Sequence, residues 1–123
     1  MASADATGNA YLVPLSFAWD GTVLISATGT GTRTVRNLVR ATATRLALGD
    51  TRDVVIIDGK VTIYGKDEVP AAIGDAFAAR NWDARQDAEP YSYIVIRPTR
   101  IQAWREESEL AGRTIMRDGT WLV

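Results

Sequence analysis

Three Asp-Gly pairs, each lying between short apolar or β-branched runs, constrain the fold of this chain more than any other feature. The pairs are Asp20-Gly21, Asp58-Gly59 and Asp118-Gly119. A pair of this kind favours the two-residue turn of a β-hairpin, because both residues tolerate the left-handed backbone that the turn requires. We therefore expect consecutive strands that pair antiparallel to one another.

The remaining patterns predict two helices among the strands. Apolar residues at helical spacing predict a helix over 33–41 with Thr32 as its N-cap, and an alanine-rich segment predicts a second over 67–80 that begins at Asp67. A turn is expected at Pro98-Thr99. Strands are expected at 11–19, 22–28, 42–48, 53–57, 60–64, 91–97, 100–105, 114–117 and 120–123. This succession predicts a mainly β (α+β) fold in one domain, 1–123, in which an antiparallel sheet closes into a barrel with two peripheral helices.

The composition excludes several kinds of chemistry. The chain has no cysteine and no histidine, which excludes disulfides, thiolate catalysis, serine–histidine triads and imidazole-bound metals. We therefore expect no metal site. The net charge of −1 does not indicate a nucleic-acid partner. Redox or transfer chemistry would have to come from carboxylates, hydroxyls, arginines, the backbone or a bound cofactor.

The hydropathy pattern does not indicate a membrane protein. No apolar run reaches the roughly 18–20 residues of a membrane helix. The segment 1–9 is small and polar, without the basic and hydrophobic regions of a secretion signal. We therefore expect a cytoplasmic protein.

The clearest candidate site is the junction from Thr28 to Asn37, where a strand ends, a Gly/Thr-rich turn follows and a helix begins. The free amides and the dipole of a helix N-terminus attract an anion, and glycines let a ligand approach the backbone. Several threonine hydroxyls are nearby, and Arg33 can hold a phosphate through two hydrogen bonds. On composition alone, a capped surface helix with solvated arginines is an equally good interpretation.

The order of elements around this junction extends the interpretation. The run GNAYLVPLSFAWDGTVLISATGTGTRTVRNLVRATATRLAL resembles the pyridoxamine 5′-phosphate oxidase-like family of split β-barrel flavoproteins. The later runs RDVVIIDGKVTIY and YIVIRPTRIQAW also fit, so the resemblance covers nearly the whole chain. The positions that match the family pattern are Gly8, Pro14, Phe17, Thr28, Gly31, Thr32, Arg33, Asn37 and Leu38.

The resemblance implies a split β-barrel that forms a homodimer, with a cofactor at the subunit interface. It also implies that the family's N-terminal helix and part of its first strand are missing here. Thr34 stands where many members have a lysine, and Arg36 is the candidate to replace that charge. The implied cofactor-binding residues are Thr28, Thr32, Arg33, Thr34, Arg36 and Asn37 around the phosphate, the backbone of Val13, Pro14, Leu15 and Ser16 along the ring, and Asp53 as a weaker candidate.

The resemblance does not separate FMN from the deazaflavin coenzyme F420, since members of the fold bind either one. Arg36, Arg40 and Arg45 would suit the acidic tail that coenzyme F420 carries. The implied function is an oxidoreductase that transfers hydride or electrons to a small-molecule acceptor. The alternative is a non-catalytic dimeric protein that binds or carries the cofactor.

Overall fold

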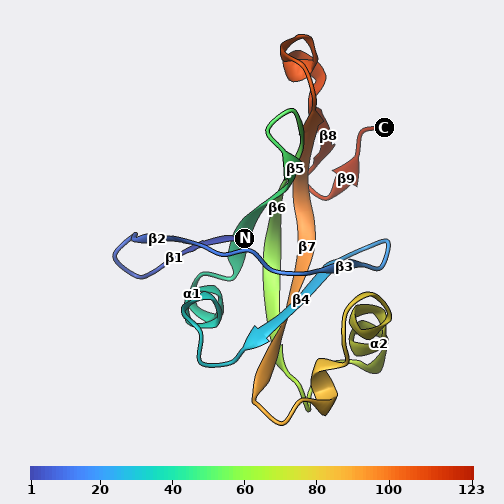
Figure 1. The fold of residues 1–123 in the computed structure, drawn as a ribbon. Coiled ribbons are helices and arrows are strands. Elements are labelled where there is room, and N and C mark those ends of the chain that lie inside the picture. The colour runs from blue at the N-terminus through green and yellow to red at the C-terminus, as the bar shows by residue number, and fades with distance from the viewer.

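The computed structural model describes all residues, 1–123, and shows a twisted antiparallel sheet flanked by two α-helices (Figure 1). The helices are α1 (Arg33–Ala41) and α2 (Ala71–Arg80), with two short 3₁₀ helices, η1 (Ala84–Gln86) and η2 (Glu107–Gly112). The strands are β1 (Ala2–Ala4), β2 (Ala10–Leu12), β3 (Ala18–Trp19), β4 (Leu24–Gly29), β5 (Ala43–Asp50), β6 (Asp53–Gly65), β7 (Tyr91–Trp104), β8 (Thr114–Arg117) and β9 (Thr120–Trp121). None of the helices combines the length and apolar character needed to cross a membrane.

All neighbouring strands pair antiparallel, in the order β2-β1-β5-β6-β7-β4-β3. In addition, β8 pairs with β7, and β9 pairs with β8. This confirms the predicted mainly β class with peripheral helices. The expected closure of the barrel is wrong, because the edge strands β2 and β3 do not pair with each other. The sheet therefore stays open between them, and the N-terminal hairpin β1–β2 projects to one side (Figure 1).

The largest correction concerns β6 and β7, which are continuous strands of 13 and 14 residues rather than two hairpins. The two turns expected at Asp58-Gly59 and Pro98-Thr99 lie opposite each other in one ladder. Asp58 pairs with Arg100 and Gly59 pairs with Pro98, so Thr99 is an extra residue that forms a β-bulge. A bulge tolerates a proline and bends the strand without reversing it. Turn-forming residues on both strands thus mark a shared bend.

Other boundaries differ for local reasons. The expected strand over 11–19 is interrupted after Leu12 and resumes at Ala18, since Pro14 cannot donate to a ladder. The loop at Asp20-Gly21 spans four residues, 20–23. Helix α2 begins at Ala71 after Pro70, so Asp67 does not cap it. The short strand β1 was not expected.

Two elements match their predictions closely. Helix α1 spans Arg33–Ala41 as predicted, and the Thr32 side chain accepts a hydrogen bond from the Val35 amide at 3.4 Å, as an N-cap does. The hairpin turn at Asp118-Gly119 is also confirmed. Both of its residues have positive φ, at 51° and 75°, which a two-residue turn of this type requires.

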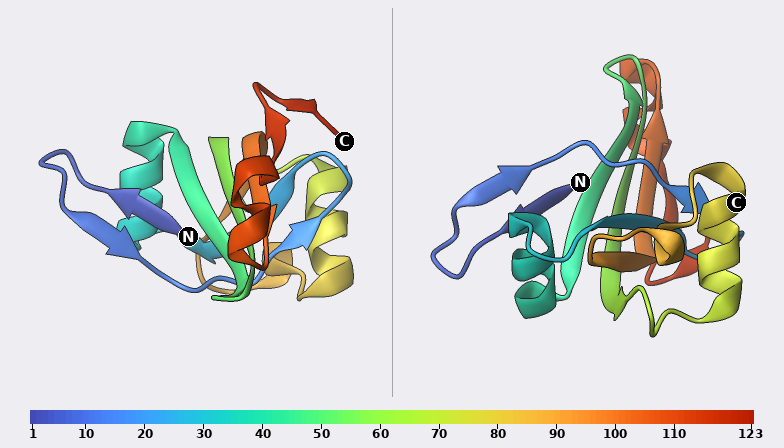
Figure 2. Two further views of the ribbon diagram at one scale, coloured as in Figure 1. Left: turned by 90° about the horizontal axis from the view of Figure 1, so that it is seen from above. Right: turned by 60° about the horizontal axis from the view of Figure 1, so that its bottom comes forward.

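The sheet buries a separate apolar cluster on each face. Leu38 of α1 belongs to the first cluster, with Leu24, Ile94 and Ile96. Phe77 of α2 belongs to the second, on the opposite face. In both views of Figure 2, as in Figure 1, α1 and α2 lie on either side of the long β6–β7 pair. Each helix therefore covers a different face of the sheet.

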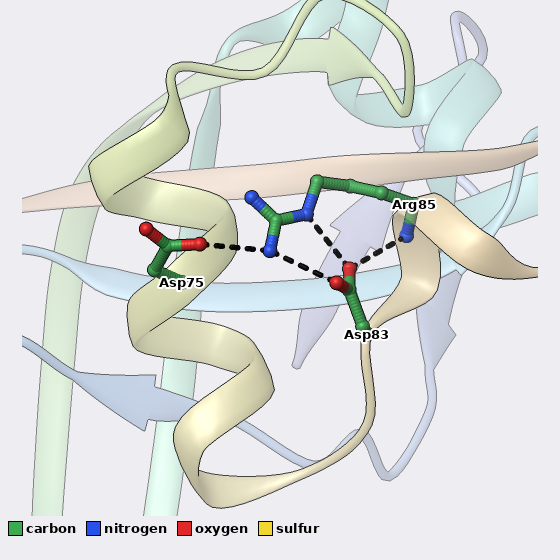
Figure 3. A network of polar contacts seen from close by, with 3 residues as sticks. All are labelled: Asp75, Asp83 and Arg85. Atoms are coloured by element: carbon green, nitrogen blue, oxygen red, sulfur yellow. Dashed lines mark hydrogen bonds and ion pairs between the residues drawn. The ribbon is translucent and has the colours of Figure 1, made fainter.

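An ion-pair network fixes η1 against α2 (Figure 3). Arg85 lies 2.8 Å from Asp75 of α2 and 2.7 Å from Asp83, the N-cap residue of η1. The Arg85 hydrogen bonds lower the pKa of Asp83. The guanidinium packs on Gly74, where an added Cβ would lie 2.6 Å from Nη1. This glycine therefore lets the arginine cross the helix surface.

Candidate functional site

The N-terminus of α1 presents backbone donors that the protein itself leaves unused. Strand β4 ends at Gly29, and the turn that follows is closed by a hydrogen bond from the Thr32 amide to the Gly29 carbonyl at 3.2 Å. The amides of Gly31, Arg33 and Thr34 donate to no acceptor in the protein. Three unpaired amides at the positive end of a helix dipole make this turn a candidate site for an anion.

Two arginines surround these amides. Arg36 folds back and donates from Nη1 to the Gly31 carbonyl at 2.6 Å. The Arg33 guanidinium lies 5.2 Å from the centre of the Tyr11 ring, which positions it between α1 and β2. No acidic residue occupies the first turn of α1, and no atom comes within 4 Å of a Cβ built on Gly31. The space beside Gly31 is thus open, and no acidic side chain of the first turn would repel an anion there.

The threonines and Asn37 are placed differently from one another. Thr28 and Thr32 are partly exposed, and the Thr32 hydroxyl can still donate while it caps the helix. Thr34 is buried, with 3% of the residue exposed, so its hydroxyl is not presented to a ligand. Asn37 is also buried, with 5% exposed, and donates to the Ser3 hydroxyl at 3.0 Å. That bond fixes α1 to the first strand.

The two more distant arginines are engaged elsewhere. Arg40 donates to the Ala4 carbonyl at 2.8 Å. Arg45 forms a two-pronged pair with Asp58, at 2.6 and 3.1 Å. The expected groove of three free arginines is thus reduced to Arg36 and its neighbour Arg33.

The segment Val13–Ser16 crosses the sheet between β2 and β3. Val13 exchanges hydrogen bonds with Met1 at 3.1 and 2.9 Å, and burial lowers the pKa of the Met1 α-ammonium. The Ser16 carbonyl accepts from the Ser26 hydroxyl of β4 at 2.8 Å. The amides of Leu15 and Ser16 have no acceptor in the protein, so they are free to bond a ligand.

An apolar cavity of about 190 Å³ lies between this segment and strands β4, β5 and β7. Ser26 and Thr28 are two residues apart on β4, so their side chains share one face of the strand. Ser26 was missed in the sequence, although a serine inside the apolar run TVLISAT was a usable signal. The lining residues are Met1, Pro14, Leu15, Phe17, Leu24, Ser26, Leu46, Ala47, Leu48 and Ile96.

Asp53 is not brought to this site. It begins β6, pairs with Asp50 across the tip of the β5–β6 hairpin, and lies 3.3 Å from Arg105. The hairpin carries it away from α1, because β5 leaves the helix and extends for eight residues before the turn. The structure contains no group of three or more acidic side chains placed to hold a metal ion.

Comparison with known proteins identifies the fold and the family. The family model described as pyridoxamine 5′-phosphate oxidase matches residues 1–105. The chain therefore belongs to the pyridoxamine 5′-phosphate oxidase-like family, whose members bind FMN or coenzyme F420 on a split barrel. No curated protein matches the chain.

Three solved structures are similar to this chain in fold. An F420 reductase is 25% identical, with a TM-score of 0.63 over 81% of this chain and 84% of the reductase. A heme-binding protein from Mycobacterium smegmatis is 15% identical, with a TM-score of 0.70 over 96% of this chain but 51% of its own. An FMN-binding protein from Nostoc punctiforme is 13% identical, with a TM-score of 0.58 over 83% of this chain and 70% of that one. The last two likenesses show the fold alone.

Proposed function

We propose that this chain binds FMN or coenzyme F420, with the cofactor phosphate at the N-terminus of α1, and that it acts as an oxidoreductase on a small molecule. The observation that carries the proposal is the set of open amides at Gly31, Arg33 and Thr34 beside Arg33 and Arg36. A phosphate there would receive backbone hydrogen bonds and the charge of two guanidinium groups.

The residues present also fit the ring of such a cofactor. The cavity under Val13–Ser16 is apolar and is lined by Pro14 and Leu15, and the amides of Leu15 and Ser16 have no acceptor in the protein. These amides are suited to donate to oxygen or nitrogen atoms at a ring edge. The Ser26–Ser16 hydrogen bond holds the segment over β4 and so orients those donors.

A bound flavin or deazaflavin supplies hydride or electron transfer, which explains how a chain without histidine or cysteine can be an enzyme. The protein's part is to bind the phosphate, to orient the ring and to exclude water with Leu24, Leu46 and Leu48. The family comparison supports FMN and coenzyme F420 alike, and the similarity to an F420 reductase is the reason to test the deazaflavin first.

We further propose a homodimer formed through the sheet face next to this cavity. The face is hollowed by an apolar pocket of about 350 Å³ lined by nine hydrophobic residues. Phe17, Trp19 and Trp121 at its rim are 40%, 42% and 49% exposed. Large exposed apolar side chains that gather on one face favour an interface, and twofold dimers are the commonest oligomers. Light scattering should give the mass of a dimer, and Trp121→Glu should shift it toward the monomer.

The experiment that tests the function is a titration with FMN and with coenzyme F420, followed by assay of the complex. Binding should change the cofactor fluorescence, and Arg33→Ala should weaken it, whereas Arg80→Ala, a control at the far end of α2, should not. The complex should then show turnover with NADPH or with the reduced deazaflavin across quinones, nitroaromatics and enones. A chain that changes the fluorescence of neither cofactor refutes the proposal.

The second candidate function is a protein that binds or carries the cofactor without turnover. The observation that favours it is Thr34, which stands where many members have a lysine and whose side chain is buried. Binding that depends on Arg33, combined with no turnover on the substrate panel, would select this alternative.

A further inference from the structure

The face of the sheet that carries α2 holds two cations that the protein leaves unpaired. Lys60 of β6 lies directly opposite Arg97 of β7 in the ladder. The five ion pairs of the structure include neither of them. Two like charges at opposite positions of an antiparallel pair destabilise a sheet. An anion bound between the two side chains would offset this repulsion.

The backbone fixes this pair in place. The β-bulge at Asp58/Gly59 comes immediately before Lys60, and bulges commonly re-aim side chains at binding sites. A Cβ on Gly59 would lie 2.5 Å from the Ile96 side chain and 2.9 Å from the Arg97 carbonyl. The absence of a side chain at Gly59 thus lets β7 approach β6 closely, directly before the Lys60–Arg97 pair.

Lys60 and Arg97 line a groove of about 510 Å³ between the sheet, the loop at 20–23 and the start of α2. The groove combines hydroxyl groups of Thr22, Thr62 and Tyr64 with an apolar lining from Val23, Pro70, Ile73 and Val95. Its volume is that of a pocket for a small organic molecule.

The carboxylates around the groove are already engaged. Asp20, which lines it, accepts from the amides of Thr22 and Val23 at 2.8 Å each. Asp58, two residues before Lys60, is held by Arg45. Neither carboxylate lies within ion-pair distance of Lys60 or Arg97, so the groove keeps a net positive charge.

We propose that this groove is a second binding site, for a small organic molecule with an anionic head and an apolar body. The head, a phosphate or a carboxylate, would lie between Lys60 and Arg97, and the body would pack on Val23, Ile73 and Val95. The site lies on the sheet face opposite the cavity near α1, so it does not depend on the proposed cofactor.

Phenyl phosphate is a suitable probe, with benzoate and inorganic phosphate as companions. In an amide NMR titration, phenyl phosphate should shift the resonances of Thr62, Val95 and Arg97. Inorganic phosphate should bind more weakly, because it lacks the apolar body, and the comparison with benzoate identifies which anionic head is preferred. Lys60→Gln and Arg97→Gln should each raise the Kd for phenyl phosphate about tenfold, which corresponds to ~1.4 kcal/mol. Arg80→Gln makes the same charge change elsewhere and should leave the Kd unchanged.

Thermal melts at low salt give an independent readout. Lys60→Gln should raise the Tm of the free protein, because it removes a like-charge contact, and should reduce the gain in Tm on adding phenyl phosphate. Arg33→Ala should leave the phenyl phosphate shifts of Thr62, Val95 and Arg97 unchanged, which separates this site from the cofactor site, where a phosphate is also expected to bind. Equal Kd values for the parent, Lys60→Gln and Arg97→Gln, or shifts confined to the α1 region, would overturn the proposal.

Discussion

Gly59→Ala tests whether β6 and β7 really run past each other as one bent pair. The structure puts a Cβ at this buried position 2.9 Å from the Arg97 carbonyl and 2.5 Å from Cγ2 of Ile96. The isoleucine methyl can rotate away, but the carbonyl belongs to the β6–β7 ladder and cannot move without opening it. Overpacking of this kind costs about 1–3 kcal/mol.

We therefore expect the free energy of unfolding to fall by about 2 kcal/mol, and the Tm to fall by roughly 5–10 °C for a chain of this size. Urea and thermal unfolding measured by circular dichroism provide the values. Gly112→Ala is the matched control, since no atom lies within 4 Å of a Cβ built there. If Gly59→Ala were as stable as Gly112→Ala, Gly59 would lie in an open turn, and the continuous strands would be wrong.

Three other perturbations test local interactions. The pKa of Asp5 is lowered to about 2, mainly by the side-chain hydrogen bond from Asn9. The contribution of this carboxylate to stability is therefore present above the usual pKa of an aspartate and is lost as the pH falls toward 2. Asn9→Ala should raise the pKa of Asp5 in an NMR titration. Asp83→Asn should lower the Tm at neutral pH, because it removes the ion pair with Arg85. The difference from the parent should vanish in acid, since Arg85 lowers the pKa of Asp83 and the parent loses the pair only when the pH falls below that lowered pKa. Phe77→Ala should cost about 3–5 kcal/mol in urea unfolding, because the ring is fully buried against its neighbours.

The sequence predicted the structure correctly where the interactions that determine it involve residues close together in the chain. The N-cap Thr32 and the apolar spacing of α1 predicted its bounds correctly. The pair Asp118-Gly119 adopts the left-handed backbone that its composition favours. In both cases the residues that decide the structure lie within a few positions of each other.

The same signals misled where a distant strand decided the outcome. Asp58-Gly59 has the composition of a hairpin turn, but Gly59 pairs with Pro98 and the ladder continues on both sides of it. Nothing near Asp58 in the sequence reveals that a second turn-like pair, Pro98-Thr99, lies opposite. The bulge is a property of the two strands together.

In the candidate site, too, the features formed by contiguous residues could be predicted and those formed by distant strands could not. The candidate anion site at α1 could be proposed from the sequence, because a strand end, a glycine turn and a capped helix are contiguous. The cavity under Val13–Ser16 could not, because its lining comes from distant strands, with Leu24 on β4 and Leu46 and Leu48 on β5. Asp53 was assigned by resemblance, and the structure places it at the hairpin tip beside Arg105.

The most direct test of the central proposal is to compare FMN with riboflavin, which lacks the phosphate, and coenzyme F420 with its phosphate-free deazaflavin. If the amides of Gly31, Arg33 and Thr34 bind the phosphate, the phosphorylated form of the preferred cofactor should bind at least ~100-fold more tightly, since two charge-assisted hydrogen bonds are worth about 3 kcal/mol or more. Arg33→Ala should reduce that ratio, and Arg80→Ala should preserve it. Equal affinity for the phosphorylated and phosphate-free forms would contradict the phosphate site at α1.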